Sequence, residues 1–424
     1  MVEVWLPYGE TEVCLTVSPE NLLDIVNPKP LPQPVNLEEE IRKTLENPLN
    51  TTRIGETIKP GEKVAIAFDK SMNVEFVGFV LTQLSKEFEK AGISSSDVTV
   101  VVGCENGKPI GQAETEKFFS KIPEGFQRKI HNPSLEEDLV EVGVTSRKTR
   151  VFLNKNFFEA DFKILIGKID FHSYAGFSGG RQTILSVCGL KTIHQNYNLS
   201  LNPKSRLGVL EENPVHQDLV EIANLAKINY TIDMIVDLDG NVLKVFSGNL
   251  EEAFEEGVNS FKSTFGVEVE DKVEIAVVSP GGHPFDLTFY DAQESLERAV
   301  WLVKDGGIIV LVAECSQGLG DKIFQRWVTS IKNVDELKTA AKKEFNLFFH
   351  RVFQLLNVLE NFRVVIVSAL PNVVVSEVLR FKSSKTVDDA VEYALRVLGK
   401  KSKIVVLPHT MKTFPILKTK EIQH

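Results

Sequence analysis

The stretch "VAIAFDKSMNVEFVGFVLTQLSKEFEKAGISSSDVTVVVG", residues 64–103, decides the fold of this chain. It opens with a short apolar run, continues through a longer segment in which apolar residues recur at helical spacing, and closes with a second apolar run. This order predicts a strand, a helix and a second strand, which is the repeating unit of a parallel sheet covered by helices on both faces.

The same alternation extends in both directions along the 424 residues. Asp239-Gly240 joins two alternating runs and predicts a β-hairpin over 228–250. Further strands are predicted at 162–169, 273–279, 306–314, 362–370 and 403–408, and helices at 112–120, 250–264, 288–304 and 386–399. The sequence therefore predicts an α/β protein of two domains, 1–268 and 269–424, each with a mostly parallel sheet flanked by helices, and an active-site cleft between them. The proline-rich segment 27–34 is expected to be an extended connector.

Composition restricts the classes of function. A net charge of -10 argues against binding to the phosphate backbone of nucleic acids. No apolar window is long enough for a membrane span, and the four scattered cysteines indicate neither a disulfide framework nor a zinc site. We therefore expect a cytoplasmic protein that acts on a small molecule, without nucleic acid or membrane partners. An assembly of several copies is compatible with the sequence.

The segment "FHSYAGFSGGRQT", residues 171–183, follows a predicted strand and combines three glycines with a histidine and an arginine. Glycines permit left-handed backbone and close approach of a ligand, and Arg181 offers a forked donor. Two interpretations stay open: a site for a phosphate or carboxylate, and a plain tight turn. His172, at the end of the strand, is a candidate for acid–base work or metal ligation, and a half-buried histidine with one hydrogen bond is the alternative.

Acidic residues end two neighbouring predicted strands. Asp69 follows the run at 64–68 and Glu105 follows the run at 98–103, so both are expected at one edge of the first sheet. In the second half, Asp291 and Glu294 lie three residues apart on a predicted helix and share one face, which a solvated charged surface would also explain. His283, after another strand, is a second candidate histidine.

Several of these motifs together resemble the lactate racemase family that uses the nickel-pincer nucleotide. The resemblance begins at "VWLPYGETEV", passes through "NKNFFEADFKILIGKIDFHSYAGFSGGRQTILSVCGLKTIHQNY" and "LDGNVLKVFSG", and reaches "GGHPFDLTFYDAQESLERA". It implies two α/β domains around a pyridinium adenylate that holds nickel and accepts the α-hydride of a 2-hydroxy acid, while a histidine pair moves the hydroxyl proton. By this resemblance His172 matches the first family histidine and Asp69 the acid of the first loop.

Reactive positions of the family are changed in this chain. Gln182 stands where the family has the lysine that bonds to the cofactor, and an amide cannot form that bond. Tyr197 stands where a histidine ligates nickel, and Met72 where an arginine grips the substrate carboxylate. Loss of such a cation costs about 2–5 kcal/mol of binding. Glu105 replaces a histidine, and Asp291 and Glu294 replace a glutamine and a lysine.

The sites expected from the residues and the resemblance are as follows. The catalytic residues are His172, Asp69 and Glu105, and the same three would bind a divalent metal ion. The cofactor, a nickel-pincer nucleotide or that ion, is expected to contact Gly176, Ser178, Gly179, Gly180, Arg181, Gln182 and Tyr197. The substrate is expected to contact Lys70, Ser71, Tyr174, His283, Asp291 and Glu294.

Two functions remain open from the sequence. One is a racemase or epimerase that acts on a 2-hydroxy acid or sugar acid other than lactate. The other is a paralogue that has lost its catalytic activity and binds a nucleotide or small acid.

Overall fold

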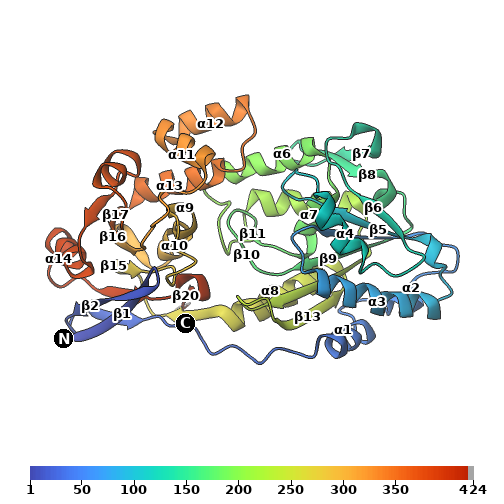
Figure 1. Cartoon of the computed structure of the whole chain (residues 1–424), viewed down its shortest axis with the longest axis horizontal. Coiled ribbons are helices and arrows are strands. Elements are labelled where there is room, and N and C mark those ends of the chain that lie inside the picture. The colour runs from blue at the N-terminus through green and yellow to red at the C-terminus, as the bar shows by residue number, and fades with distance from the viewer. Residues whose placement is uncertain (419–424) are drawn as a thin grey trace, which may run out of the picture. The chain divides into compact units, whose positions relative to one another are not determined.

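The computed structural model describes residues 1–418 and confirms the α/β class (Figure 1). The chain forms two compact units. Pro32–Phe261 makes one unit, and Met1–Leu31 together with the chain from Lys262 onward makes the other. Within residues 1–418, no helix combines the length and apolar composition needed to cross a lipid bilayer.

The unit Pro32–Phe261 is built on a six-stranded sheet in the order β13-β12-β9-β4-β5-β6. All neighbours are parallel except β12 and β13, which form the predicted hairpin. The strands are β4 (Val64–Asp69), β5 (Val98–Gly103), β6 (Gln127–Ile130), β9 (Phe162–Lys168), β12 (Tyr230–Val236) and β13 (Val242–Gly248). Two small antiparallel pairs accompany them: β7 (Leu139–Val144) with β8 (Arg150–Asn154), and β10 (Phe171–His172) with β11 (Gly176–Phe177).

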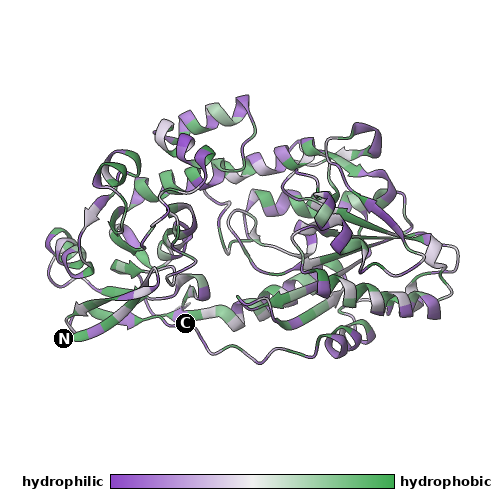
Figure 2. Cartoon of the chain, in the orientation of Figure 1, coloured by the Kyte–Doolittle hydropathy of each residue, from purple (hydrophilic) through white to green (hydrophobic). Residues whose placement is uncertain are grey.

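Helices cover this sheet on both faces because successive side chains of each strand point to opposite sides. Ile66 and Phe68 of β4 join a core with α1 and α3, whereas Ala65 and Ala67 join a second core with α5 and α7. Figure 2 shows hydrophobic and hydrophilic residues side by side along the helices, as expected for helices with one buried face. The helices of this unit are α1 (Leu37–Glu46), α2 (Ile54–Thr57), α3 (Val74–Lys90), α4 (Gln112–Phe119), α5 (Lys155–Phe158), α6 (Leu190–Asn198), α7 (Pro214–Ala226) and α8 (Leu250–Phe265).

The second unit contains another six-stranded sheet, β18-β17-β16-β15-β19-β3, in which all neighbours are parallel. Its strands are β3 (Leu22–Ile25), β15 (Val273–Val278), β16 (Val303–Val312), β17 (Arg363–Val367), β18 (Lys382–Ser384) and β19 (Ile404–Leu407). The hairpin of β1 (Val2–Tyr8) and β2 (Thr11–Val17) and helix α14 (Val387–Leu398) share a core with this sheet. The other elements are α9 (Phe289–Ala292), α10 (Glu294–Ala299), α11 (Lys322–Ser330), α12 (Val334–Lys343), α13 (Phe349–Asn361), β14 (Gly266–Val269) and β20 (Phe414–Leu417).

Two features differ from the expectations drawn from the sequence. The division at 268/269 leaves residues 1–31 in the N-terminal domain, but β3 pairs with β19, so this segment belongs to the second unit. The single helix expected over 288–304 is instead two short helices, α9 and α10, and β16 already begins at Val303 because Val303 pairs with Val273. The connector 27–34 has no regular secondary structure, as predicted, and contains the boundary between the two units.

Candidate functional site

The carboxyl ends of β4, β5 and β9 meet at one edge of the first sheet, as their parallel pairing requires. A pocket of about 360 Å³ opens there, which we call the glycine-loop pocket. It is lined by Asp69, Ser71, Met72, Asn73, Glu105, Ile166, Gly167, Lys168, Ser178, Gly179, Gln182, Thr183, Met234, Val236 and Gly240. All of these residues belong to the unit Pro32–Phe261.

The two predicted carboxylates, Asp69 and Glu105, both reach this pocket. Asp69 is buried, with 7% of its surface exposed, and its two oxygens accept hydrogen bonds from the backbone N–H groups of Ser71 at 2.8 Å and Glu105 at 2.7 Å. Asp69 therefore fixes the two loops that follow β4 and β5 relative to each other. This anchoring uses both carboxylate oxygens, which leaves Glu105 as the carboxylate better able to act on a ligand.

Glu105 is paired with a neutral side chain. Its Oε2 accepts a hydrogen bond at 2.6 Å from the amide Nε2 of Gln182, which is 4% exposed. Burial and the nearby Asp69 raise the pKa of Glu105 well above its ordinary value, against the opposing effect of the Gln182 hydrogen bond. A carboxyl group with a raised pKa can both donate and accept a proton near neutral pH.

The glycine segment shapes the pocket, but several of its N–H groups are already used. Ser178 N–H donates to the Asp170 carbonyl, Gly180 N–H to Asp233 Oδ1 at 2.7 Å, and Gln182 N–H to the Gly179 carbonyl. The expected cradle of N–H groups around an anion is therefore wrong for these three amides. Gly179 needs its glycine because its φ is +85° and a Cβ would lie 2.9 Å from Asp233 Oδ1.

Arg181 does not line the glycine-loop pocket, contrary to its expected role there. Its Nη1 lies 2.8 Å from Nε2 of His216, and its guanidinium carbon lies 4.4 Å from the ring centre of Phe254. These contacts hold the guanidinium at a second, smaller pocket, which shares no lining residue with the first. The ring of Phe254 fills the space beside Gly180, where a Cβ would lie 2.8 Å from a ring carbon. Gly180 too is absent from the lining of the glycine-loop pocket.

The aromatic residues of the segment form a cluster of their own. His172 and Tyr174 meet edge to face at 4.4 Å between ring centres, and Tyr174 meets Tyr197 at 5.3 Å. His172 Nδ1 accepts a hydrogen bond from Ala175 N–H at 3.2 Å. None of these three rings lines the glycine-loop pocket. Gly176 sits beside them with a φ of +86°, where a Cβ would lie 2.1 Å from a backbone oxygen.

The metal site expected from His172, Asp69 and Glu105 is wrong. Among residues 1–418, no group of three or more His, Cys, Asp or Glu side chains is placed to hold a metal ion. The reason is local: both Asp69 oxygens accept backbone N–H groups, Glu105 accepts from an amide, and His172 lies within the aromatic cluster.

The expected substrate residues divide between different places. Ser71 lines the glycine-loop pocket, whereas Lys70 turns away and its Nζ donates to the Lys108 carbonyl at 2.7 Å. In the second unit, His283 is exposed and its N–H donates to the Gly9 carbonyl. Asp291 is also exposed. Its N–H donates to the hydroxyl oxygen of Thr288, which caps α9, and its carboxylate accepts from the same hydroxyl.

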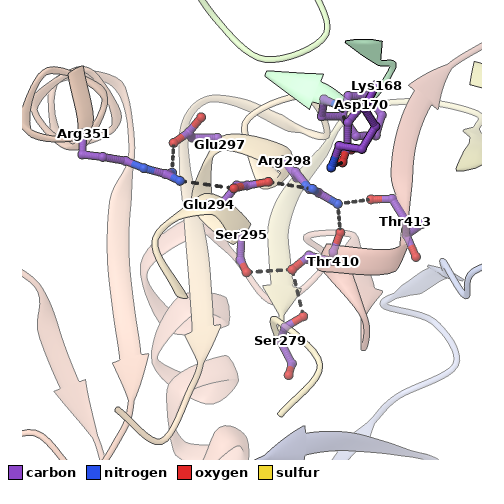
Figure 3. Close-up of polar contacts among 11 residues, drawn as sticks. Lys168, Asp170, Ser279, Glu294, Ser295, Glu297, Arg298, Arg351, Thr410 and Thr413 are labelled. Atoms are coloured by element: carbon purple, nitrogen blue, oxygen red, sulfur yellow. Dashed lines mark hydrogen bonds and ion pairs between the residues drawn. The ribbon is translucent and has the colours of Figure 1, made fainter. Parts of the chain in front are cut away.

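Glu294 belongs to a buried ion network in the second unit (Figure 3). It accepts from Arg298 at 2.7 Å and lies 3.2 Å from Arg351, which also contacts Glu297 at 2.8 Å. Although burial opposes ionisation, the two arginines lower the pKa of Glu294 to about 2, whereas burial raises the pKa of Glu297 to about 8. Arg298 also donates to the carbonyl groups of Thr410 and Thr413, so the network stabilises the loop after β19.

Sequence reasoning missed two residues that matter at the pocket. Lys168, at the end of β9, supplies a cationic side chain to its lining and forms a half-exposed ion pair with Asp170 at 2.8 Å. Asp233 lies buried on β12 beneath the glycine segment, and burial raises its pKa to about 6. Lys168 is the last residue of β9, and its place near the carboxyl end of a predicted strand was a usable signal, since strand ends also identified Asp69 and Glu105.

Comparison with known proteins gives this arrangement its context. The lactate racemase N-terminal domain model matches residues 8–208, and the lactate racemase C-terminal domain model matches residues 269–414. The chain belongs to the lactate racemase family. It is 26% identical to the lactate racemase of Thermoanaerobacterium thermosaccharolyticum over 96% of this chain and 98% of that protein. It is 25% identical to the lactate racemase of Lactiplantibacillus plantarum over the same shares.

Solved structures agree with this membership. The lactate racemase apoprotein from Thermoanaerobacterium thermosaccharolyticum superposes with a TM-score of 0.80 at 25% identity, covering 99% of this chain and 100% of that one. A protein from Thermotoga maritima superposes with a TM-score of 0.55 at 16% identity over 92% of this chain and 100% of that one, which shows the fold alone.

The residues of this chain do not fit the nickel-pincer nucleotide as the family resemblance implies it is held. Gln182 occupies the position of the anchoring lysine, and its amide donates to Glu105 instead of offering a nucleophilic amine. Tyr197 occupies the position of a nickel-ligating histidine and is 3% exposed against Tyr174. Neither the covalent bond nor that metal ligand is therefore available.

Proposed function

We propose that this protein is an isomerase of the racemase or epimerase type, acting on a 2-hydroxy acid or sugar acid other than lactate. Membership of the lactate racemase family supports the reaction type. The observation that carries the proposal is the placement of Glu105 in the glycine-loop pocket with a neutral partner, Gln182, and a raised pKa. In this proposal the Glu105 carboxylate takes the proton from the α-carbon of the substrate, the electron pair of that C–H bond is held as an enolate on the substrate carboxyl group, and the α-carbon then takes back a proton that has exchanged with solvent.

The other side chains of the pocket have supporting roles in this proposal. Asp69 holds the backbone of Glu105 through its N–H, so it positions the loop that carries the acid. Lys168 is the cation available to a substrate carboxylate, which would compete with Asp170 for it. Met72 lines the pocket where the family resemblance implies an arginine, so the two-pronged grip on a small carboxylate is missing. This loss supports a substrate other than lactate.

The test is exchange of deuterium at the α-carbon across a panel of 2-hydroxy acids and sugar acids, with the native protein in heavy water. We expect exchange with at least one member, and a loss of about 10²–10⁴-fold in Glu105→Gln because general acid–base catalysis contributes that much. Glu116→Gln, which changes an exposed glutamate on α4, is the control and should keep the native rate. Silence across the panel, or a Glu105→Gln protein as active as the native one, contradicts the proposal.

A second function is favoured by the hydrogen bonds of the same residues. Glu105 and Gln182 bond to each other, and both oxygens of Asp69 are engaged by backbone amides. This arrangement suits a paralogue that binds a nucleotide or small acid without turnover. Calorimetry with adenylates separates the two functions: binding with no exchange across the panel supports the binding protein, and the lack of any binding removes it.

A further inference from the structure

Two consecutive residues of the glycine segment line different pockets. Gln182 lines the glycine-loop pocket, whereas Arg181 lines a smaller pocket of about 170 Å³. The smaller one, which we call the Arg181 pocket, lies between the end of α7 and the start of α8 and includes Asn224, Lys227 and Asn249. All of it belongs to the unit Pro32–Phe261.

Arg181 is buried with unused hydrogen-bonding capacity. Only 5% of its surface is exposed, and one guanidinium nitrogen, Nη1, lies 2.8 Å from Nε2 of His216. Its Nη2 is buried and has no hydrogen-bond partner among the described residues. A buried guanidinium N–H group without an acceptor is unfavourable, and an acceptor supplied by a ligand in the pocket would remove that cost.

His216 does not neutralise this charge. Burial and the neighbouring Arg181 lower the pKa of His216 to about 3, so its ring is neutral at pH 7 and accepts the hydrogen bond through Nε2. Phe254 covers the guanidinium face and adds no formal charge. The cationic charge of Arg181 is therefore retained at the wall of the pocket.

The remaining lining is mostly suited to an anion. Lys227 adds a second cation, and the side-chain amides of Asn224 and Asn249 can donate hydrogen bonds. Asn249 also caps α8, since its side chain accepts the N–H of Glu251, and the start of this 16-residue helix carries partial positive charge. Glu251 lies in the lining as well, and its carboxylate acts on Arg181 together with those of Glu255 and Asp233, so the case for an anion depends on the unpartnered Nη2 of Arg181 rather than on an excess of positive charge.

We propose that the Arg181 pocket binds a small oxyanion, a carboxylate or a phosphate, and that this site is separate from the glycine-loop pocket. Nη2 of Arg181 provides the central donor, Lys227 provides a second charge at the rim, and the start of α8 faces the same space. The volume suits a group of the size of phosphate or acetate rather than a nucleotide.

The experiment is calorimetric titration of the full chain with inorganic phosphate and, separately, with acetate, at constant ionic strength. The native protein should bind at least one of them, and the one bound more tightly identifies the ligand as phosphate or carboxylate. Arg181→Gln should weaken binding by about tenfold or more, because hydrogen bonds to charged groups are worth that much. Arg150→Gln, which changes an exposed arginine paired with Glu141 in the same unit, should bind as the native protein does.

A second variant keeps the test decisive if Arg181→Gln fails to fold. Lys227 is exposed and has a φ of +55°, a left-handed conformation that asparagine also adopts, so Lys227→Asn removes the charge with little strain. It should weaken binding by about threefold. The proposal is overturned if the native protein binds neither anion, or if both variants that fold bind as tightly as the native protein. Glu105→Gln should leave this binding unchanged, which separates the outcome from that of the proposed function.

Discussion

Glu105 and Glu294 are carboxylates enclosed in the two different units, and their partners give them opposite properties. Glu105 accepts from the neutral amide of Gln182, and its pKa is raised by burial and by Asp69. Glu294 is held by Arg298 and Arg351, which overcome burial and lower its pKa to about 2. A neutral donor leaves a buried carboxyl group able to hold a proton, whereas the two arginines at Glu294 fix it as an anion. Glu297, which pairs with Arg351 alone, keeps a pKa of about 8.

This contrast assigns different work to the two regions. The glycine-loop pocket contains an acid that can take up and release a proton beside a ligand. The network of Glu294, Glu297, Arg298 and Arg351 holds α10, α13 and the loop after β19 together. Substitutions in the network should therefore change stability, and substitutions in the pocket should change proton exchange.

The largest effect on stability is expected at Arg351. Arg351→Met removes the cation shared by Glu294 and Glu297, whose side chains are 17% and 8% exposed, and leaves Glu294 with Arg298 alone and Glu297 with no cationic partner. The free energy of unfolding should fall by about 3–5 kcal/mol, as measured by chemical denaturation at pH 7.

The matched control for that change is Arg326→Met. Arg326 pairs with Glu344 at 3.3 Å, and both side chains are at least half exposed, so the loss should be about 1 kcal/mol or less. If both variants lose the same stability, the network is not the stabilising element described above.

A smaller effect, with a defined pH dependence, is expected at Asp233 beneath the glycine segment. Its pKa in the folded protein is about 6, raised by burial against hydrogen bonds from Gly180 N–H and the Thr231 hydroxyl. The folded state therefore binds more protons than the unfolded state between about pH 4 and pH 6, and stability falls as pH rises through that window.

Asp233→Asn should lack this fall while keeping an oxygen for Gly180 N–H. Denaturation at pH 4.5 and pH 8 should show that the native protein loses about 2 kcal/mol more than the variant over this range. Identical pH dependence in the two proteins would show that Asp233 does not carry a raised pKa.

The sequence predicted the strands of the first sheet and the carboxylates at their ends, because both depend on the local pattern of apolar residues. The runs at 64–68 and 98–103 became neighbouring parallel strands, and this pairing brought Asp69 and Glu105 to one edge. A short stretch of sequence is enough to predict a buried strand and where it ends, so both carboxylates could be assigned to the same sheet edge without a structure.

Long-range contacts could not be predicted in this way. Strand β3 pairs with β19 across almost the whole chain, and nothing near residue 22 specifies that partner. Arg181 was expected at the anion site of its own loop, but its side chain contacts His216 and Phe254 and lines another pocket. Glu294 was expected to bind a ligand. Its ion pair with Arg351 was missed because the two residues are far apart in the sequence.

The pKa of Glu105 tests the central claim most directly. It can be followed by NMR of protein labelled with ¹³C at glutamate Cδ, with Glu105→Gln to assign the signal and Gln182→Lys to convert the neutral partner into a cation. The account predicts a pKa well above the ordinary value in the native protein and a lower pKa in Gln182→Lys, because a cation beside the carboxyl group favours its charged form. A native Glu105 that titrates at or below the ordinary value, unchanged by Gln182→Lys, would contradict it.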